Sequence, residues 1–279
     1  MTVVRVAVPS RGRLRDDVMA LLDLAGYRMS AFRGTGARAV LDGVEFIEMR
    51  PRDAAAWLWA GRVDAAFLST DIVLEEGLEA YAALPLGVSQ SDLVVASRDD
   101  DGRVSVEDLA GAVVATHLPR ATAAWFAARG VEVAVVAMGG ALEGVCAAGM
   151  ADAIVDLRQT GTSLSQNRLR ALATIAPCEA LFVHSEHGAL GDLALRLGAA
   201  IDARRQRYVM LHIPRAKLDE LVGIFPGLAS PTVLPLAGRD ALVAVHLVVE
   251  ASTFWSRLGE VRAAGASGIV ALAPEALLR

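Results

Sequence analysis

The sequence has few cysteines, few aromatic residues and no long apolar run. Its 279 residues include two cysteines, Cys146 and Cys178, whose separation fits neither a metal site nor a disulfide framework. We therefore expect two buried thiols and a reducing, cytoplasmic location. No stretch reaches the roughly 18 apolar residues of a membrane-spanning helix, and the first residues do not read as a signal peptide. These absences predict a protein with no membrane partner.

Positive charge is not in excess either. Lysine and arginine number 27 against 32 acidic residues, for a formal net charge of −5. This balance gives no support for a nucleic-acid partner, which needs a basic face. It still allows an anionic ligand to bind where positive charge is local. Hydrophobic residues make up 54% of the chain, enough apolar surface for the two or three domains that its length suggests.

Short apolar runs alternate with helical patterns through the first two hundred residues. Val18, Leu21 and Leu22, for example, recur at the spacing of one helix face, and Gly26 follows as an end signal. Such alternation predicts an α/β fold with mostly parallel sheets, in two lobes that change over near residues 85–92. The expected strands are 3–8, 44–49, 63–68, 93–96, 113–116, 131–137, 153–157 and 180–184.

The pattern changes after a polar, basic stretch at residues 202–207. The remaining segments read as strand, helix, two strands, helix and strand, which is the ferredoxin-like βαββαβ order. The expected strands are 208–213, 232–236, 242–249 and 268–272, and the expected helices are 216–224 and 252–264.

Residues 152–167 are the most informative segment for function. Asp152 and Asp156 flank an apolar run, and a glycine- and hydroxyl-rich turn at residues 160–163 precedes a helix start. Backbone N–H groups and hydroxyls that converge at such a turn suit a phosphate, helped by the helix dipole. Asp156 could accept hydrogen bonds from sugar hydroxyls, so the segment reads as a ribose-phosphate site. An ordinary βα turn with a Ser/Thr cap is the alternative.

Two basic loops follow predicted strands. Arg11 and Arg13 come after the first strand, and Arg50 and Arg52 come after the second. Open α/β sheets bind ligands at the carboxyl ends of their strands, and the guanidinium fork suits phosphate oxygens. Two such loops at equivalent strand ends favour an anion pocket over the alternative of solvent-exposed basic loops.

Two further strand ends carry candidate ligand groups. Gly139 and Gly140 permit close backbone approach to a ligand ahead of a helix that begins near Glu143, although a flexible turn is an equal alternative. His117 also ends a strand, where a histidine is more commonly a polar surface or capping residue.

In this order, the segments resemble the long form of ATP phosphoribosyltransferase, the first enzyme of histidine biosynthesis. The resemblance spans nearly the full chain. It is carried by residues 7–14, 50–53, 64–71, 140–143, 151–167, 226–236 and 263–269.

The resemblance implies a bilobal, periplasmic-binding-protein-like catalytic half and an ACT-like C-terminal regulatory domain. The first lobe would comprise residues 1–90 and 179–204, the second lobe 91–178, and the regulatory domain 206–279. The family transfers a phosphoribosyl group from phosphoribosyl pyrophosphate to N1 of ATP with Mg²⁺. It is inhibited by histidine and assembles as a homo-hexamer from dimers.

The resemblance also implies residue roles. Asp152, Asp156 and Arg13 would be catalytic, with the two aspartates near the ribose or its metal; metal ligands cannot be named. The residues expected to cradle the 5-phosphate are Thr160, Gly161, Thr162, Ser163 and Leu164. Those expected to border the nucleotide are Arg11, Arg50, Gly139, Gly140 and Glu143, and those expected to bind histidine are Asp219, Ser230, Thr232 and Ala266.

Three positions depart from the family's usual pattern. Arg11 stands where lysine is usual, Leu68-Ser69 replaces a Thr-Gly pair at a strand end, and Leu118 replaces a tyrosine. Two alternatives therefore stay open: a paralogue that ribosylates another acceptor, and a non-catalytic regulator that uses the bilobal fold as a ligand clamp.

Overall fold

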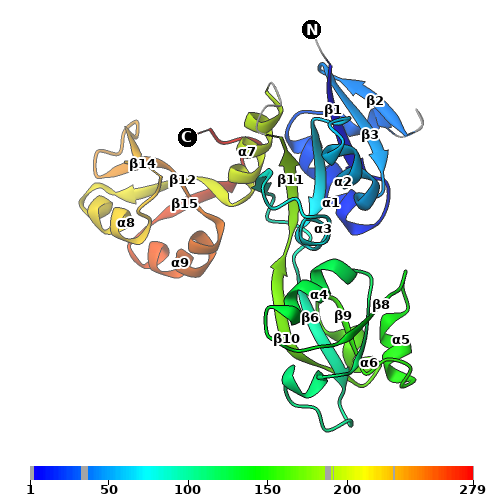
Figure 1. Ribbon diagram of the computed structural model, residues 1–279. Coiled ribbons are helices and arrows are strands. Elements are labelled where there is room, and N and C mark those ends of the chain that lie inside the picture. The colour runs from blue at the N-terminus through cyan, green and yellow to red at the C-terminus, as the bar shows by residue number, and fades with distance from the viewer. Residues whose placement is uncertain (1–2, 33–36, 186–189, 191, 229, 279) are drawn as a thin grey trace. The chain divides into compact units, whose positions relative to one another are not determined.

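The computed structural model describes residues 3–32, 37–185, 190, 192–228 and 230–278 (Figure 1). The chain divides into two compact units. The N-terminal unit contains residues 1–20 and 28–191, and the C-terminal unit contains 21–27 and 192–279. None of the described helices has the length and apolar character needed to cross a membrane.

The first lobe of the N-terminal unit is built on a six-stranded sheet in the order β2-β3-β1-β4-β11-β5. Its centre, β3-β1-β4, is parallel, and β2, β11 and β5 are antiparallel to their neighbours. The strands are β1 (Val4–Pro9), β2 (Arg38–Leu41), β3 (Val44–Met49), β4 (Ala65–Ser69), β5 (Ala82–Pro85) and β11 (Ala180–His184). The helices are α1 (Gly12–Leu24), the 3-10 turn η1 (Met29–Phe32), α2 (Pro51–Trp59) and α3 (Thr70–Glu76).

The second lobe is built on a five-stranded sheet in the order β10-β6-β9-β7-β8. Strands β6 and β10 run between the two lobes, as Figure 1 shows. The strands are β6 (Ser91–Arg98), β7 (Val113–Thr116), β8 (Ala134–Ala137), β9 (Ala153–Arg158) and β10 (Leu169–Cys178). The helices are the 3-10 turn η2 (Glu107–Leu109), α4 (Pro119–Ala127), α5 (Leu142–Ala147) and α6 (Thr162–Gln166).

The expectation of mostly parallel sheets is wrong, because both sheets are mixed. Among the described strands, parallel pairing is found for β1–β3, β1–β4, β7–β8 and β7–β9. Three strands that the sequence analysis did not include, β2, β5 and β10, all pair in antiparallel fashion. Strand β2 joins β3 through a two-residue turn in which Asp42 and Gly43 have φ of 47° and 79°. That Asp-Gly pair is a hairpin signal.

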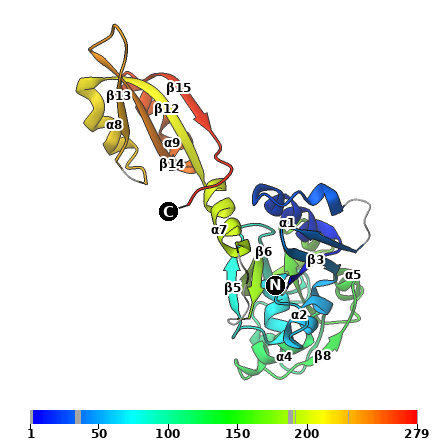
Figure 2. The ribbon, with the colours of Figure 1, turned by 90° about the horizontal axis from the view of Figure 1, so that it is seen from above.

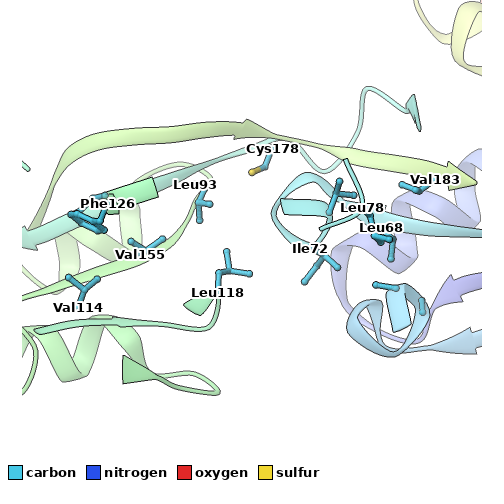
Figure 3. Close-up of a cluster of buried hydrophobic side chains, with 14 of the residues drawn as sticks. Leu68, Ile72, Leu78, Leu93, Val114, Leu118, Phe126, Val155, Cys178 and Val183 are labelled. Atoms are coloured by element: carbon cyan, nitrogen blue, oxygen red, sulfur yellow. The ribbon is translucent and has the colours of Figure 1, made fainter. Parts of the chain in front are cut away.

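Apolar side chains form one continuous core through both lobes. Leu118, ahead of α4, lies beside Ile72 of α3, and both side chains are buried (Figure 3). Cys178 belongs to the same core at the end of β10, and Cys146 of α5 is buried in another apolar cluster of the second lobe, which confirms the prediction of two buried thiols. Burial also raises the pKa of the Cys178 thiol to about 12. The lobes are thus joined by packed side chains as well as by the chain itself.

The C-terminal unit confirms the predicted βαββαβ order. Its antiparallel sheet has the order β13-β14-β12-β15 (Figure 2). Alternate residues of β12, Val209, Leu211 and Ile213, are buried against α8 and α9. The elements are α7 (Leu193–Arg204), β12 (Gln206–Pro214), the 3-10 turn η3 (Arg215–Lys217), α8 (Leu218–Ile224), β13 (Thr232–Pro235), β14 (Leu242–Glu250), α9 (Ala251–Ala263) and β15 (Ser267–Leu272).

The domain boundaries stay a prediction, although the strands of each sheet fall within the range expected for that domain. Helix α7 is grouped differently from the prediction. We expected residues 179–204 in the first lobe, but the contacts of α7 group it with the C-terminal unit.

Candidate functional site

The ribose-phosphate segment folds as strand β9, a tight turn and helix α6. The turn needs glycine at position 161, because Gly161 has φ of 80°, a conformation that costs other residues energy. Helix α6 is five residues long, its N-cap residue Gly161 has no side chain, and only the Thr162 N–H is paired with a side chain, in a long 3.4 Å bond to Thr160 Oγ1. The N–H groups of its first turn therefore lack intrahelical partners. So short a helix adds little dipole, so the N–H groups and hydroxyls are the groups of this turn with the chemistry to bind an anion.

This turn forms one wall of a pocket of about 360 Å³. The pocket brings together all five residues expected at the 5-phosphate with Asp156 and Glu143, whereas Asp152 is not part of it. Its lining comprises Val94, Glu143, Asp156, Leu157, Arg158, Gln159, Thr160, Gly161, Thr162, Ser163, Leu164 and Gln166.

Hydrogen bonds order the polar groups of the turn. The hydroxyls of Thr160 and Thr162 lie 3.0 Å apart, and the Ser165 hydroxyl donates to the Gly161 carbonyl at 3.1 Å. The Ser163 hydroxyl donates to Glu143 Oε1 from helix α5. The α5 side of the pocket therefore carries negative charge and suits hydroxyl or amino groups, while the turn itself suits a phosphate.

Asp156 stands at the end of β9, beside the turn. The pKa of its carboxyl is raised above the ordinary value, mainly by burial. The Leu157 N–H and His117 lower this pKa, and the negative charges of Glu143 and Asp71 raise it further. Asp156 Oδ1 accepts from the Leu157 N–H at 2.7 Å and lies 3.6 Å from His117 Nδ1. Both contacts use Oδ1, so within the described part of the chain Oδ2 is the atom available to a ligand hydroxyl.

Asp152 has a different environment at the other end of β9. Its carboxylate accepts from the Val113 N–H at 2.9 Å and from Arg103 Nη2 at 2.8 Å. These bonds, the Val113 bond first, hold the pKa of Asp152 below its ordinary value. The geometry therefore gives Asp152 a structural role, tying β7 and the Arg103 loop to β9, and does not support the catalytic role expected from the sequence.

Replacing Asp152 with Ala should reduce stability and leave activity nearly intact. The pKa of Asp152 is lower in the folded state than in the unfolded state, so the carboxylate stabilises the folded protein at neutral pH. This stabilisation is lost as the pH falls through the folded-state pKa. We expect a loss of about 1–2 kcal/mol in unfolding free energy at pH 7, a modest value because the pair is partly exposed. The difference should shrink near pH 3. Urea denaturation at both pH values measures it, and a pH-independent difference would contradict this assignment.

The basic loops lie at neighbouring strand ends. Pro9 of β1 pairs with Met49 of β3, so the loops that carry Arg11 and Arg50 start side by side. Both arginines are exposed, and among the described residues neither forms an ion pair. Arg13 Nη2 donates to the Gln90 carbonyl at 3.3 Å.

Gln90 lines a second pocket, of about 570 Å³, at the junction of the lobes. Arg158 and Gln159 line both this pocket and the 360 Å³ pocket, so the two are contiguous. Arg158 Nη2 is held by Asp92 Oδ2 at 2.7 Å. The full lining is Thr70, Gln90, Ser91, Asp92, Arg158, Gln159, Pro177, Cys178, Glu179 and Leu181.

The sequence analysis did not select Arg158 or Gln159. Both follow β9 directly and precede the predicted phosphate turn, and a cation at such a position is a usable signal. Conversely, Gly139 and Gly140 lie in an exposed loop and line neither pocket, whereas Glu143 lines the smaller one.

Within the described residues, the pocket beside α9 does not bring together the residues expected to bind histidine. Asp219 lies exposed in the first turn of α8, Ser230 precedes β13, and Thr232 lies opposite His246 in the β13–β14 register. Ala266 alone among them lines a pocket of about 610 Å³ beside α9.

The fold and the pocket together define the class of protein: a bilobal α/β protein with an added ferredoxin-like domain. The bilobal half carries a polar pocket at a strand–turn–helix, and the added domain is the βαββαβ module.

Comparison with known proteins gives the family. The ATP phosphoribosyltransferase family model matches residues 50–197, and the model of that family's C-terminal domain matches residues 203–275. ATP phosphoribosyltransferases of Gemmatimonas aurantiaca and Methanocella arvoryzae are 36% and 32% identical to this chain, over 99% of its length and 100% of theirs. The chain belongs to the ATP phosphoribosyltransferase family.

A solved structure shares the fold. The structure described as an ATP phosphoribosyl transferase (HisG:HisZ) complex from Thermotoga maritima matches with a TM-score of 0.60 and 24% identity. The match covers 71% of this chain and 98% of that chain.

Proposed function

We propose that this protein transfers the phosphoribosyl group of phosphoribosyl pyrophosphate to N1 of ATP and releases pyrophosphate, the first step of histidine biosynthesis. Family membership along the full chain supports the reaction. The single structural observation that carries it is the pocket that joins residues 160–164 to Asp156.

The pocket's chemistry matches the sugar-phosphate donor. The first-turn N–H groups of α6 and the hydroxyls of Thr160 and Thr162 bind the 5-phosphate, because a helix start with open donors suits an anion. The free Oδ2 of Asp156 accepts hydrogen bonds from the ribose hydroxyls. Arg158, between the two pockets, is placed to face the negative charge of donor and acceptor phosphates.

The reaction exchanges one bond for another at C1 of the ribose. The C1–O bond to pyrophosphate breaks with its electron pair on oxygen, and the N1 lone pair of adenine forms the new C1–N bond. Positive charge develops on the sugar, and negative charge develops on the leaving group. Arginines near the diphosphate offset the latter, and alignment of N1 against C1 supplies much of the remaining acceleration. We name no general base, since N1 attacks through a lone pair.

Magnesium fits this site as part of the donor. Within the described ranges no group of three or more His, Cys, Asp or Glu side chains is arranged to hold a metal ion. Mg²⁺ commonly binds through substrate phosphates and keeps several waters. We therefore propose that the donor's diphosphate, and not a cluster of side chains, would hold Mg²⁺, whose charge would offset negative charge on the leaving group.

The residues Leu68, Ser69 and Leu118, which depart from the family pattern, line neither of the two pockets. Leu68 and Leu118 are both fully buried in the core shared by the lobes. Ser69 is the residue before α3, next to Thr70, which lines the larger pocket. Burial of the two leucines favours ATP as the acceptor over a changed acceptor site.

The test is turnover with defined substrates. Protein mixed with phosphoribosyl pyrophosphate, ATP and Mg²⁺ should release pyrophosphate and form phosphoribosyl-ATP, identified by its mass. Release with another nucleobase compound only would favour the divergent paralogue. Ligand binding without turnover in folded protein would favour the non-catalytic regulator.

We also propose that histidine inhibits the enzyme through the C-terminal unit, and that the protein works in the cytoplasm as a homo-hexamer assembled from dimers, as the family resemblance implies. The βαββαβ module, separate as a compact unit from the donor pocket, supports a distinct regulatory site.

Replacing Thr232 with Trp should relieve inhibition by histidine. Thr232 is exposed on β13, so a bulky side chain there blocks a ligand without disturbing the core. We expect the histidine concentration for half-inhibition to rise at least about tenfold, the loss of roughly 1.4 kcal/mol of binding free energy, with uninhibited turnover unchanged. Ser256→Trp, at an exposed position of α9, is the matched control. An unchanged inhibition curve for the Thr232 variant would place the effector site elsewhere.

A further inference from the structure

We infer that His117 is a positioning residue for Asp156, acting from the seam between the lobes on the carboxylate that binds the donor's ribose. The inference rests on the proposed function. The sequence analysis gave His117 a surface or capping role as the more common alternative.

The imidazole of His117 lies between two carboxylates. Its Nδ1 is 3.6 Å from Asp156 Oδ1 on β9, and its Nε2 is 4.0 Å from Asp71 Oδ2 on α3. Asp71 is 3% exposed, and its Oδ1 has no hydrogen-bond partner in the described structure. A buried carboxylate with an unpartnered oxygen is costly unless a cation is near. His117 is the group placed to supply that charge to both carboxylates.

The backbone of His117 is fixed from the first lobe. Arg52 of α2 donates from Nη2 to the His117 carbonyl, and the same Nη2 lies 3.9 Å from Glu75 Oε1. Glu75 is 2% exposed, and its carboxylate accepts from the N–H groups of Arg120 and Ala121, which start α4. Both lobes therefore hold the short loop that carries His117.

The charged groups around the imidazole determine how it affects the ionisation of Asp156. Asp71 faces it from α3 and Asp156 from β9, while Arg52 of α2 contacts the backbone carbonyl of the same residue. Glu143 of α5 adds negative charge at Asp156. A positively charged imidazole within about 4 Å favours the ionised form of Asp156. It thereby opposes burial and the charges of Glu143 and Asp71, which favour the protonated form of that carboxyl. Ionisation leaves Oδ2 without a proton, so that this oxygen accepts hydrogen bonds from the sugar hydroxyls.

Replacing His117 with Gln tests the inference through a pH profile. Without the imidazolium, Asp156 should hold its proton to higher pH, so the acid limb of kcat/KM for phosphoribosyl pyrophosphate should move up by about one pH unit. At low pH the variant should be roughly tenfold less efficient than the wild type. At pH 8.5, well above the acid limb, the two should agree within about threefold, and kcat at saturating donor should change little.

A matched control and a binding measurement make the outcome decisive. Arg120→Ala removes a 3.8 Å ion pair with Glu76 across the same seam without touching Asp156, and it should leave the acid limb in place. Calorimetric affinity for phosphoribosyl pyrophosphate, measured against pH, should show the same shift for His117→Gln, with His117→Asn as a second variant. An unmoved limb in an active His117 variant would overturn the inference. Wild-type protein without turnover would instead overturn the proposed function, and the calorimetric titration would still decide the role of His117.

Discussion

Replacing Asp156 with Asn should lower kcat/KM for phosphoribosyl pyrophosphate by about 100-fold or more. Each hydrogen bond to a charged acceptor contributes about 1.5–3 kcal/mol, and the ribose offers two hydroxyls to this carboxylate. The amide keeps the shape of the side chain but presents one acceptor atom and no charge. Steady-state kinetics with varied donor measure the loss, and histidine affinity should be unchanged.

The same substitution should not destabilise the fold. Burial raises the pKa of the Asp156 carboxyl, so ionisation at neutral pH costs folding free energy, and that cost disappears when the residue is neutral. The Asn variant should therefore unfold at the same or slightly higher urea concentration than the wild type. Asp152→Ala is the matched control with the reverse signature, less stable and nearly fully active. A loss of stability and activity together at Asp156 would contradict its assignment to the donor site.

Replacing Gly161 with Ala should weaken donor binding by about 10- to 100-fold. The nearest atom to an added Cβ would be Arg158 Cδ at 3.9 Å, so space is available, but φ of 80° is strained for alanine by about 1–2 kcal/mol. To relieve the strain the turn must shift, and the N–H groups of α6 then point away from the phosphate. Calorimetry with the donor measures the change in affinity.

Gly149 offers a control with the same strain at a distance from the pocket. It follows α5, has φ of 72°, and an added Cβ would meet Arg98 Nη1 at 3.6 Å. Gly149→Ala should cost similar stability and leave the donor KM unchanged. Equal effects on KM in both variants would show that general strain, and not the phosphate turn, determines donor binding.

Local sequence patterns predicted much of this fold because, in many elements, the apolar residues of the sequence are the residues that the fold buries. The strands 44–49, 113–116 and 180–184 match the structure to the residue, since each is a short segment rich in β-branched, aromatic or aliphatic residues. Strands β2 and β5 are four residues long and alternate between half-buried and exposed positions, so each is too short and too exposed to stand out as a strand in the sequence. Strand β10 departs from regular register at two points, which removes the period-2 signal.

The donor pocket could be foreseen because its parts are contiguous in sequence. Asp156 and the turn at 160–164 are joined by three residues, so one motif carries both. Asp152 matched the motif equally well, but the length of β9 carries it to the opposite end of the lobe. The cluster of Asp71, His117 and Asp156 could not be read from spacing, because three separate elements bring it together across the seam between the lobes.

The most direct measurement is a crystal structure of the protein with phosphoribosyl pyrophosphate and Mg²⁺ bound. The account predicts the 5-phosphate against the N–H groups of the α6 first turn, with a ribose hydroxyl within hydrogen-bond distance of Asp156. Donor bound elsewhere, with the pocket at residues 160–164 filled by water alone, would contradict it.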